Sequence, residues 1–134
     1  MSRNAPSVDH YMHRFPHTID ADESLEAAHK LMRTYQIRHL PVMSDGDLVG
    51  LLSQRDLLLI ETLKDVVPSR VPVRDAMARK PFVTAPSDPI DKVAAEMAAN
   101  RIGSAVVVEE GEVIGIFTTV DALIALLHVW KTVP

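Results

Sequence analysis

The sequence predicts an α+β fold in which one small unit is used twice. The run Gly50-Leu-Leu-Ser-Gln-Arg-Asp56 recurs 65 residues later as Gly115-Ile-Phe-Thr-Thr-Val-Asp121, and the same gapless shift aligns Met12 with Met77. Each copy also shows the same order of patterns: strand, helix, strand, strand, helix. A unit of about 60 residues buries little apolar surface by itself. We therefore expect the two copies to form one intramolecular pair.

The first copy opens with a helical turn at 8–12 and an extended piece at 17–19. A helix follows, with Asp22 or Ser24 as its N-cap, since both side chains accept hydrogen bonds from backbone N–H groups. Five residues fall at helical spacing on one face of this helix: Leu25, Ala28, Leu31, Met32 and Tyr35.

Two strand-like runs, 39–43 and 47–52, flank Asp45-Gly46. Asp-Gly between apolar runs is a strong hairpin signal, so we expect an antiparallel pair. A helix is predicted from Ser53 to about Val66, followed by a linker over 67–72 that contains two prolines. The first repeat is thus predicted to span 8–66.

The second repeat, predicted over 73–130, follows the same plan. Its helix is expected to be capped by Ser87, with Pro89 in the first turn, and to end near Asn100. The other predicted elements are an extended piece at 82–84, strands at 104–109 and 112–117 around Gly111, and a closing helix at 118–130.

Composition narrows the class of protein. The 134 residues are 47% hydrophobic and 24% charged, which is typical of one soluble globular domain. A net charge of -4 without a run of Lys or Arg argues against nucleic-acid binding, and no apolar stretch is long enough for membrane spanning. The chain has no cysteine, which excludes thiolate metal sites and favours a cytoplasmic location.

The sequence does not predict catalysis or metal binding. His10, His13 and His17 are close together, but Pro16 interrupts them and their spacing does not follow one helix face, so we expect no metal site. Neither a nucleophile with its base, nor a Gly-rich phosphate loop, nor a catalytic carboxylate pair is identifiable. We therefore expect no enzymatic activity and no catalytic residue.

The doubled motif has the chemistry of a nucleotide site. A helix N-terminus with unpaired N–H groups can receive phosphate oxygens beside the hydroxyls of Ser53, Thr118 and Thr119. The carboxylates of Asp56 and Asp121 can accept hydrogen bonds from both hydroxyls of a ribose. The alternative interpretation is that these residues only cap their helices.

These motifs resemble a tandem pair of CBS domains, the cystathionine-beta-synthase-type regulatory module. The resemblance covers roughly 8–130 and rests on the doubled motif, on Ile37-Arg-His-Leu-Pro-Val42, on Ile102-Gly-Ser-Ala-Val-Val107 and on Val73-Arg-Asp-Ala-Met77. It implies two βαββα repeats related by pseudo-two-fold symmetry. It also implies an adenine nucleotide, AMP, ADP or ATP, in the clefts between the repeats.

The resemblance assigns further site residues. Arg38 and His39 lie where the family has phosphate-contacting basic residues, and Arg55 lies inside the first motif; the alternative for all three is surface solvation. Their counterparts in the second copy carry no charge, so the two sites cannot be equivalent. The adenine slot would be formed by residues that also suit the core: Ile19, Ile37 and Val42 in one cleft, and Thr84, Ile102 and Val107 in the other. Core packing is the expected role of the two valines, whereas the Thr84 hydroxyl could face the base.

The sequence thus favours a non-catalytic regulatory module without an obligatory cofactor, which senses an adenine nucleotide and signals its occupancy to an unknown regulated protein. One alternative is a ligand-free scaffold for dimerisation. Another is a module that binds SAM or NAD. We expect a homodimer in each case, because CBS pairs commonly resemble flat dimers.

Overall fold

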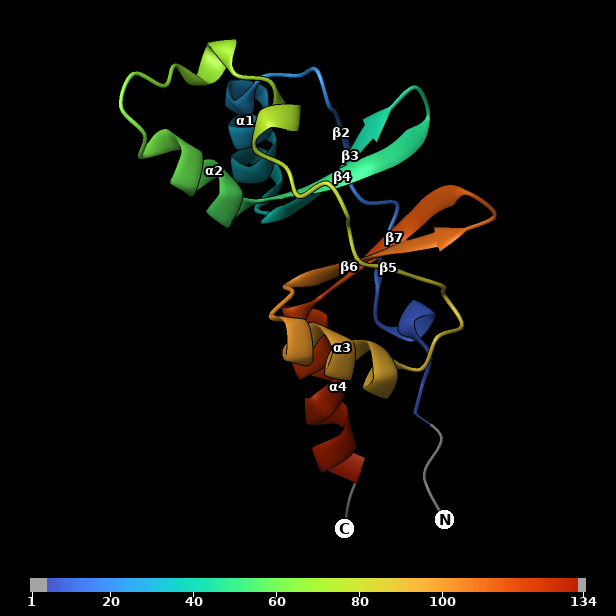
Figure 1. Cartoon of the computed structure of the whole chain (residues 1–134). Coiled ribbons are helices and arrows are strands. Elements are labelled where there is room, and N and C mark those ends of the chain that lie inside the picture. The colour runs from blue at the N-terminus through green and yellow to red at the C-terminus, as the bar shows by residue number, and fades with distance from the viewer. Residues whose placement is uncertain (1–4, 133–134) are drawn as a thin grey trace. The chain divides into compact units, whose positions relative to one another are not determined.

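The computed structural model describes residues 5–132, which divide into two compact units (Figure 1). The first-motif unit is His17–Pro81, and the second-motif unit combines residues 5–16 with residues 82–132. The segment that opens each sequence repeat, 8–16 or 73–81, therefore belongs to the unit that carries the other copy of the motif. The repeat boundaries 8–66 and 73–130 are a division by sequence similarity and stay a prediction.

The first-motif unit contains a three-stranded sheet in the order β2-β3-β4. Strand β2 (Ile19–Asp20) is parallel to β3 (His39–Ser44), and β3 is antiparallel to β4 (Asp47–Ser53). The predicted hairpin is confirmed. At its turn Asp45 and Gly46 both have positive φ, 51° and 84°, which is the backbone that a two-residue hairpin turn needs.

Helix α1 (Leu25–Tyr35) begins at Ser24, whose hydroxyl accepts a hydrogen bond from the Ala27 N–H at 3.1 Å. Of the two predicted caps, Ser24 is therefore the one used. Helix α2 (Gln54–Glu61) ends well before the predicted Val66. Asp65 has a left-handed φ of 66°, and Pro68 follows shortly after it, so a helix cannot continue through to Val66.

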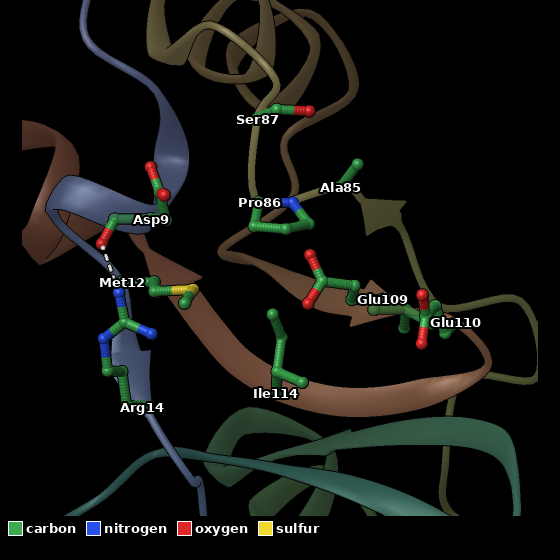
Figure 2. Close-up of a pocket in the computed structure, with 10 residues that line it drawn as sticks. Asp9, Met12, Arg14, Ala85, Pro86, Ser87, Glu109, Glu110 and Ile114 are labelled. Carbon is green, nitrogen blue, oxygen red and sulfur yellow. Dashed lines mark hydrogen bonds between the residues drawn. The ribbon is translucent and has the colours of Figure 1, made fainter.

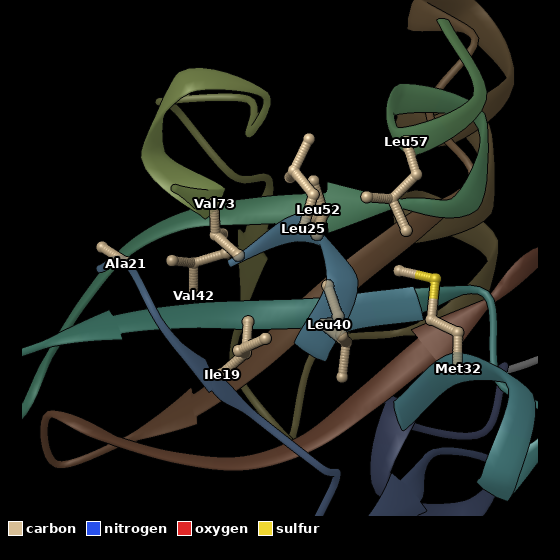
Figure 3. Packing of buried hydrophobic residues seen from close by; sticks show 10 residues of the cluster. Ile19, Ala21, Leu25, Met32, Leu40, Val42, Leu52, Leu57 and Val73 are labelled. Carbon is tan, nitrogen blue, oxygen red and sulfur yellow. The ribbon is translucent and has the colours of Figure 1, made fainter. Parts of the chain in front are cut away.

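Figure 3 shows the core of this unit, where side chains of the sheet, the helices and the 73–77 segment meet. Val73 belongs to a short 3₁₀ turn (Val73–Asp75) and is fully buried among them. The buried members are Ile19, Ala21, Leu25, Ala28, Met32, Leu40, Val42, Leu52, Leu57 and Val73.

The second-motif unit has a four-stranded sheet in the order β1-β7-β6-β5. Its strands are β1 (His13–Arg14), β5 (Val83–Thr84), β6 (Ser104–Glu109) and β7 (Glu112–Thr118). Strands β6 and β7 form the predicted hairpin, and β5 is parallel to β6. Strand β1 was not predicted, and it pairs with β7 antiparallel. The predicted helical turn at the start of the chain is a 3₁₀ turn (Val8–His10).

Helix α3 (Ile90–Asn100) has Pro89 as its N-cap, so the prediction that Ser87 caps it is wrong. A main-chain group replaces the side-chain cap: the Ile90 N–H donates to the Pro6 carbonyl at 2.9 Å. Helix α4 (Thr119–Thr132) closes the described chain. The buried core of this unit consists of Val8, Met12, Ile90, Val93, Met97, Ala105, Val107, Phe117 and Ala125.

Candidate functional site

The first motif forms a reciprocal cap at the start of α2. The Asp56 N–H donates to Ser53 Oγ at 3.1 Å, and the Ser53 N–H donates to Asp56 Oδ2 at 3.0 Å. Within residues 5–132 no hydrogen bond reaches the other oxygen, Oδ1. The half-buried Asp56 side chain therefore combines a capping role with one uncommitted carboxylate oxygen.

The second motif repeats this cap with a more crowded carboxylate. Asp121 Oδ2 accepts hydrogen bonds from the Thr118 N–H at 2.9 Å and the Thr118 hydroxyl at 3.2 Å. The Asp121 N–H donates back to Thr118 Oγ1 at 3.4 Å. Both the N–H and the hydroxyl of Thr119 donate to the Gly103 carbonyl, at 3.1 and 3.2 Å. Asp121 is only 2% exposed.

One contact of Asp121 was missed by sequence reasoning. Nδ1 of His13 lies 3.2 Å from Asp121 Oδ1 and 3.3 Å from Oδ2. The sequence raises His13 only as a possible metal ligand, because the pairing of β1 with β7 joins segments about a hundred residues apart and leaves no local signal. Within the described residues, no group of three or more His, Cys, Asp or Glu side chains could hold a metal ion.

Each motif also faces the first residue of the neighbouring strand. His39 pairs with Ser53 and Ser104 pairs with Thr118 in the β register. Ser104 is fully buried, and its hydroxyl has no hydrogen-bond partner among residues 5–132. No local pattern singles out Ser104 as a site residue, although the 65-residue shift aligns it with His39. An unpaired buried hydroxyl carries a free-energy cost, which a ligand could remove.

Three basic residues, Arg38, His39 and Arg55, belong to the first motif and its neighbouring strand. Burial lowers the pKa of His39 below its usual value of 6.5; Arg38 adds to this, and Asp56 opposes it. The neutral imidazole is therefore favoured at neutral pH. Arg38 and Arg55 are exposed, and within the described part of the chain neither forms an ion pair. The Gln54 N–H donates to the Arg38 carbonyl at 2.8 Å, which holds Arg38 beside the start of α2.

Two of the predicted adenine-slot residues, Ile19 and Thr84, lie apart from the motif hydroxyls, whereas Ile102 lines a groove together with Thr119. Ile19 pairs with Val42, and Thr84 pairs with Val107. Val107 is three positions along β6 from Ser104, which corresponds to about 10 Å. Because strand side chains alternate, Ile19 and Thr84 both lie on the core face of their sheets, opposite to the motif hydroxyls. Ile37 and Ile102 are partly buried against the two cores. Their predicted contact with adenine stays a prediction.

The Thr84 hydroxyl already has a partner. It donates to Asp88 Oδ2 at 2.6 Å, and the Ala85 N–H reaches the same oxygen at 2.8 Å. These two hydrogen bonds, that of Thr84 being the stronger influence, lower the pKa of Asp88. Only the acceptor lone pairs of the buried Thr84 hydroxyl remain for a ligand.

A cavity of about 470 Å³ lies at the hairpin end of the second-motif unit, away from the motif (Figure 2). It is lined by the carboxylates of Asp9, Glu109 and Glu110 and by one cation, Arg14, whose guanidinium reaches the Asp9 carbonyl at 3.5 Å. The excess of negative charge makes this cavity unfavourable for a phosphate. None of the predicted site residues lines it.

The chain is similar to parts of longer enzymes. It is 29% identical over 133 residues to inosine-5'-monophosphate dehydrogenase of Korarchaeum cryptofilum, which covers 98% of this chain and 27% of the relative. The chain thus spans about a quarter of that protein's length. Within residues 5–132, no helix combines the length and the apolar character needed to cross a membrane.

Two solved structures cover nearly the whole chain. The CBS domain pair of protein MJ0100, in complex with 5'-methylthioadenosine and S-adenosyl-L-methionine, aligns with a TM-score of 0.83 and 25% identity, covering 96% of this chain and 99% of the other. CBSX2 in complex with AMP aligns with a TM-score of 0.78 and 25% identity, covering 94% and 99%. The family of the CBS domain matches residues 8–61 and 73–128. With this match over both repeats and the α+β architecture described above, the chain belongs to the CBS domain family and contains two CBS domains in tandem.

Proposed function

We propose that this chain is a non-catalytic regulatory module that binds an adenosine-containing ligand, with AMP, ADP or ATP as the preferred class, and signals its occupancy to a partner protein. The first motif carries the proposal. The start of α2 carries the exposed Arg55 and an uncommitted carboxylate oxygen of Asp56, and the backbone of the exposed Arg38 is hydrogen-bonded to Gln54 at the same helix end. The similar chains crystallised with AMP and with S-adenosyl-L-methionine support the adenosine moiety.

The ribose and the phosphate of a nucleotide each have matching groups at the first motif. Ribose hydroxyls donate to the Asp56 carboxylate, while the phosphate lies near the positive end of α2 and the guanidinium groups. His39, kept neutral by burial, supplies one N–H donor to this end and no charge. The phosphate's charge is therefore balanced by Arg38 and Arg55 rather than by the histidine. A SAM or NAD ligand would keep the ribose contact and change only the end that meets the arginines.

A module of this kind acts on a partner only if ligand binds two of its states with different affinity. The two motifs differ in charge and in carboxylate access, so one site dominates the response. We propose a cytoplasmic setting, which the lack of cysteine supports.

Asp56→Asn should weaken AMP binding at least tenfold. The amide keeps the size of the carboxylate and one acceptor for the cap, but it loses the charge and one acceptor for the ribose. A hydrogen bond to a charged group is worth about 1.5–3 kcal/mol, which corresponds to a tenfold change or more. Isothermal titration calorimetry with AMP, ATP, S-adenosyl-L-methionine and NAD measures the effect and ranks the ligands.

Asp91→Asn is the matched control, because Asp91 is exposed in the first turn of α3 and the charge change is the same. Its affinity should equal that of the wild type. Equal affinities for the wild type and Asp56→Asn would refute the ribose role of Asp56. If none of the four ligands produced heat with the wild type, the sensor function itself would be refuted.

A second function, as a dimerisation scaffold, is supported by an apolar surface on α4. Leu123, Leu127 and Trp130 are 55%, 53% and 72% exposed. Beside them lies a groove of about 720 Å³ between α3 and α4, lined almost entirely by apolar residues that include Ala94 and Ala98. Small residues permit close helix approach, and an apolar surface of this kind marks an interaction site. We propose that a second copy of the chain covers it, with or without ligand.

Leu123→Asp should convert this dimer to a monomer, because the carboxylate would be buried without a partner in the interface. Light scattering at micromolar concentration measures the mass. Leu59→Asp on α2 is the control: Leu59 is similarly exposed, at 58%, and this change should leave the mass unaltered. A monomeric wild type would contradict the proposal.

A further inference from the structure

The two candidate carboxylates differ in how they are covered. Both oxygens of Asp121 have a hydrogen-bonding group within reach: Oδ2 is held by the N–H and hydroxyl of Thr118, and the His13 imidazole lies beside both oxygens at 3.2 and 3.3 Å. Asp121 is 2% exposed, whereas the His13 side chain is 68% exposed. The imidazole therefore lies over the carboxylate from the solvent side.

The backbone fixes His13 in this place. His13 pairs with Ile116 on β7, so its side chain emerges on the same face as Ile116 and Thr118. The neighbouring Met12 lies against Gly115, where an added Cβ would be 2.5 Å from the Met12 sulfur and 3.0 Å from the His13 carbonyl oxygen. This close approach is possible only because residue 115 is a glycine. The contact with Asp121 thus follows from the register of β1.

The first-motif unit has the same backbone arrangement without the imidazole. Ala78 occupies the position that corresponds to His13, and it exchanges two backbone hydrogen bonds with Leu51, at 2.9 and 3.0 Å. A methyl group cannot hydrogen-bond to Asp56. The half-buried Asp56 accordingly keeps Oδ1 without a hydrogen bond among the described residues.

We propose that His13 determines which of the two sites an adenosine ligand occupies first. Its imidazole takes the hydrogen-bonding position that ribose hydroxyls would need on Asp121, so the ligand must displace it there but not at Asp56. The Asp121 site is therefore the weaker one, by about tenfold, the worth of one hydrogen bond to a charged group. This inference rests on the proposed function. It adds that His13 sets the order in which the ligand fills the two sites.

The test isolates the Asp121 site in an Asp56→Asn background. Adding His13→Ala to this variant should raise its affinity for AMP about tenfold, measured by calorimetry. The same gain is expected for 5'-methylthioadenosine, which has the ribose hydroxyls but no phosphate. It should be smaller for 2'-deoxy-AMP, which lacks one of the two hydroxyls. Arg14→Ala, an exposed neighbour on β1, is the control and should give no gain.

A second readout does not depend on affinity. Saturating AMP should move the NMR signals of the His13 imidazole in the wild type, because the ring loses its contact with Asp121. Equal affinities of Asp56→Asn with and without His13→Ala, or imidazole signals that do not move at saturation, would overturn the proposal while AMP binding persists. Absence of AMP binding to the wild type would instead refute the proposed function.

Discussion

Phe117→Ala should lower the free energy of unfolding of the second-motif unit by about 3–5 kcal/mol. Phe117 is among the largest fully buried side chains, and it lies on β7 inside the core of that unit. Removing the ring leaves a cavity among close-packed neighbours from α3 and α4, which cannot collapse fully. Because the two units have separate buried clusters, the loss should be concentrated in one of them.

Amide hydrogen exchange distinguishes the two units. In Phe117→Ala the amides of β6 and β7 should lose more protection than those of β3 and β4. Leu52 is the residue 65 positions earlier and is also fully buried, so Leu52→Ala is the matched variant and should show the reverse pattern. An equal loss of protection in both sheets would contradict the separation into two cores.

The elements that could be predicted from sequence are those with local signals. The Asp45-Gly46 dipeptide determines its turn through the positive φ of both residues, and the spacing of Leu25, Ala28 and Met32 identifies the buried face of α1. Such signals operate within a few residues. The 65-residue repeat then extends each prediction to the second copy, which is why the order of elements is confirmed in both.

What could not be predicted depends on distant pairings. The cap of α3 comes from the Pro6 carbonyl, and the contact of His13 with Asp121 follows from the pairing of β1 with β7. Neither has a signature in the neighbouring sequence. The capping interpretation of the motif is confirmed for both copies, whereas its role in ligand binding requires a ligand to be observed. The motif glycines, Gly50 and Gly115, are a further case. Their role can be recognised only when the methionine segments that pack on them are known.

Gly50→Ala should lower the free energy of unfolding of the first-motif unit by about 3 kcal/mol, at the upper end of the cost of overpacking. A Cβ at this position would lie 2.5 Å from the Met77 sulfur and 2.7 Å from the Ala78 carbonyl oxygen. The methionine can change rotamer, but the Ala78 carbonyl accepts a hydrogen bond from the Leu51 N–H. The 77–78 backbone must therefore move, which weakens its hydrogen bonds to Leu51. Urea unfolding measures the loss.

Two further variants separate the causes of this loss. Met77→Ala combined with Gly50→Ala should recover only the part due to the sulfur, because the carbonyl contact remains. Gly46→Ala is the control for the loss of glycine itself: nothing lies within 4 Å of its Cβ position, and its φ of +84° alone should cost about 1 kcal/mol. If Gly50→Ala lowered the free energy of unfolding no more than Gly46→Ala, the motif would not need Gly50 for close packing. The larger cost expected here means that the motif requires glycine so that the methionine segment can lie against its strand.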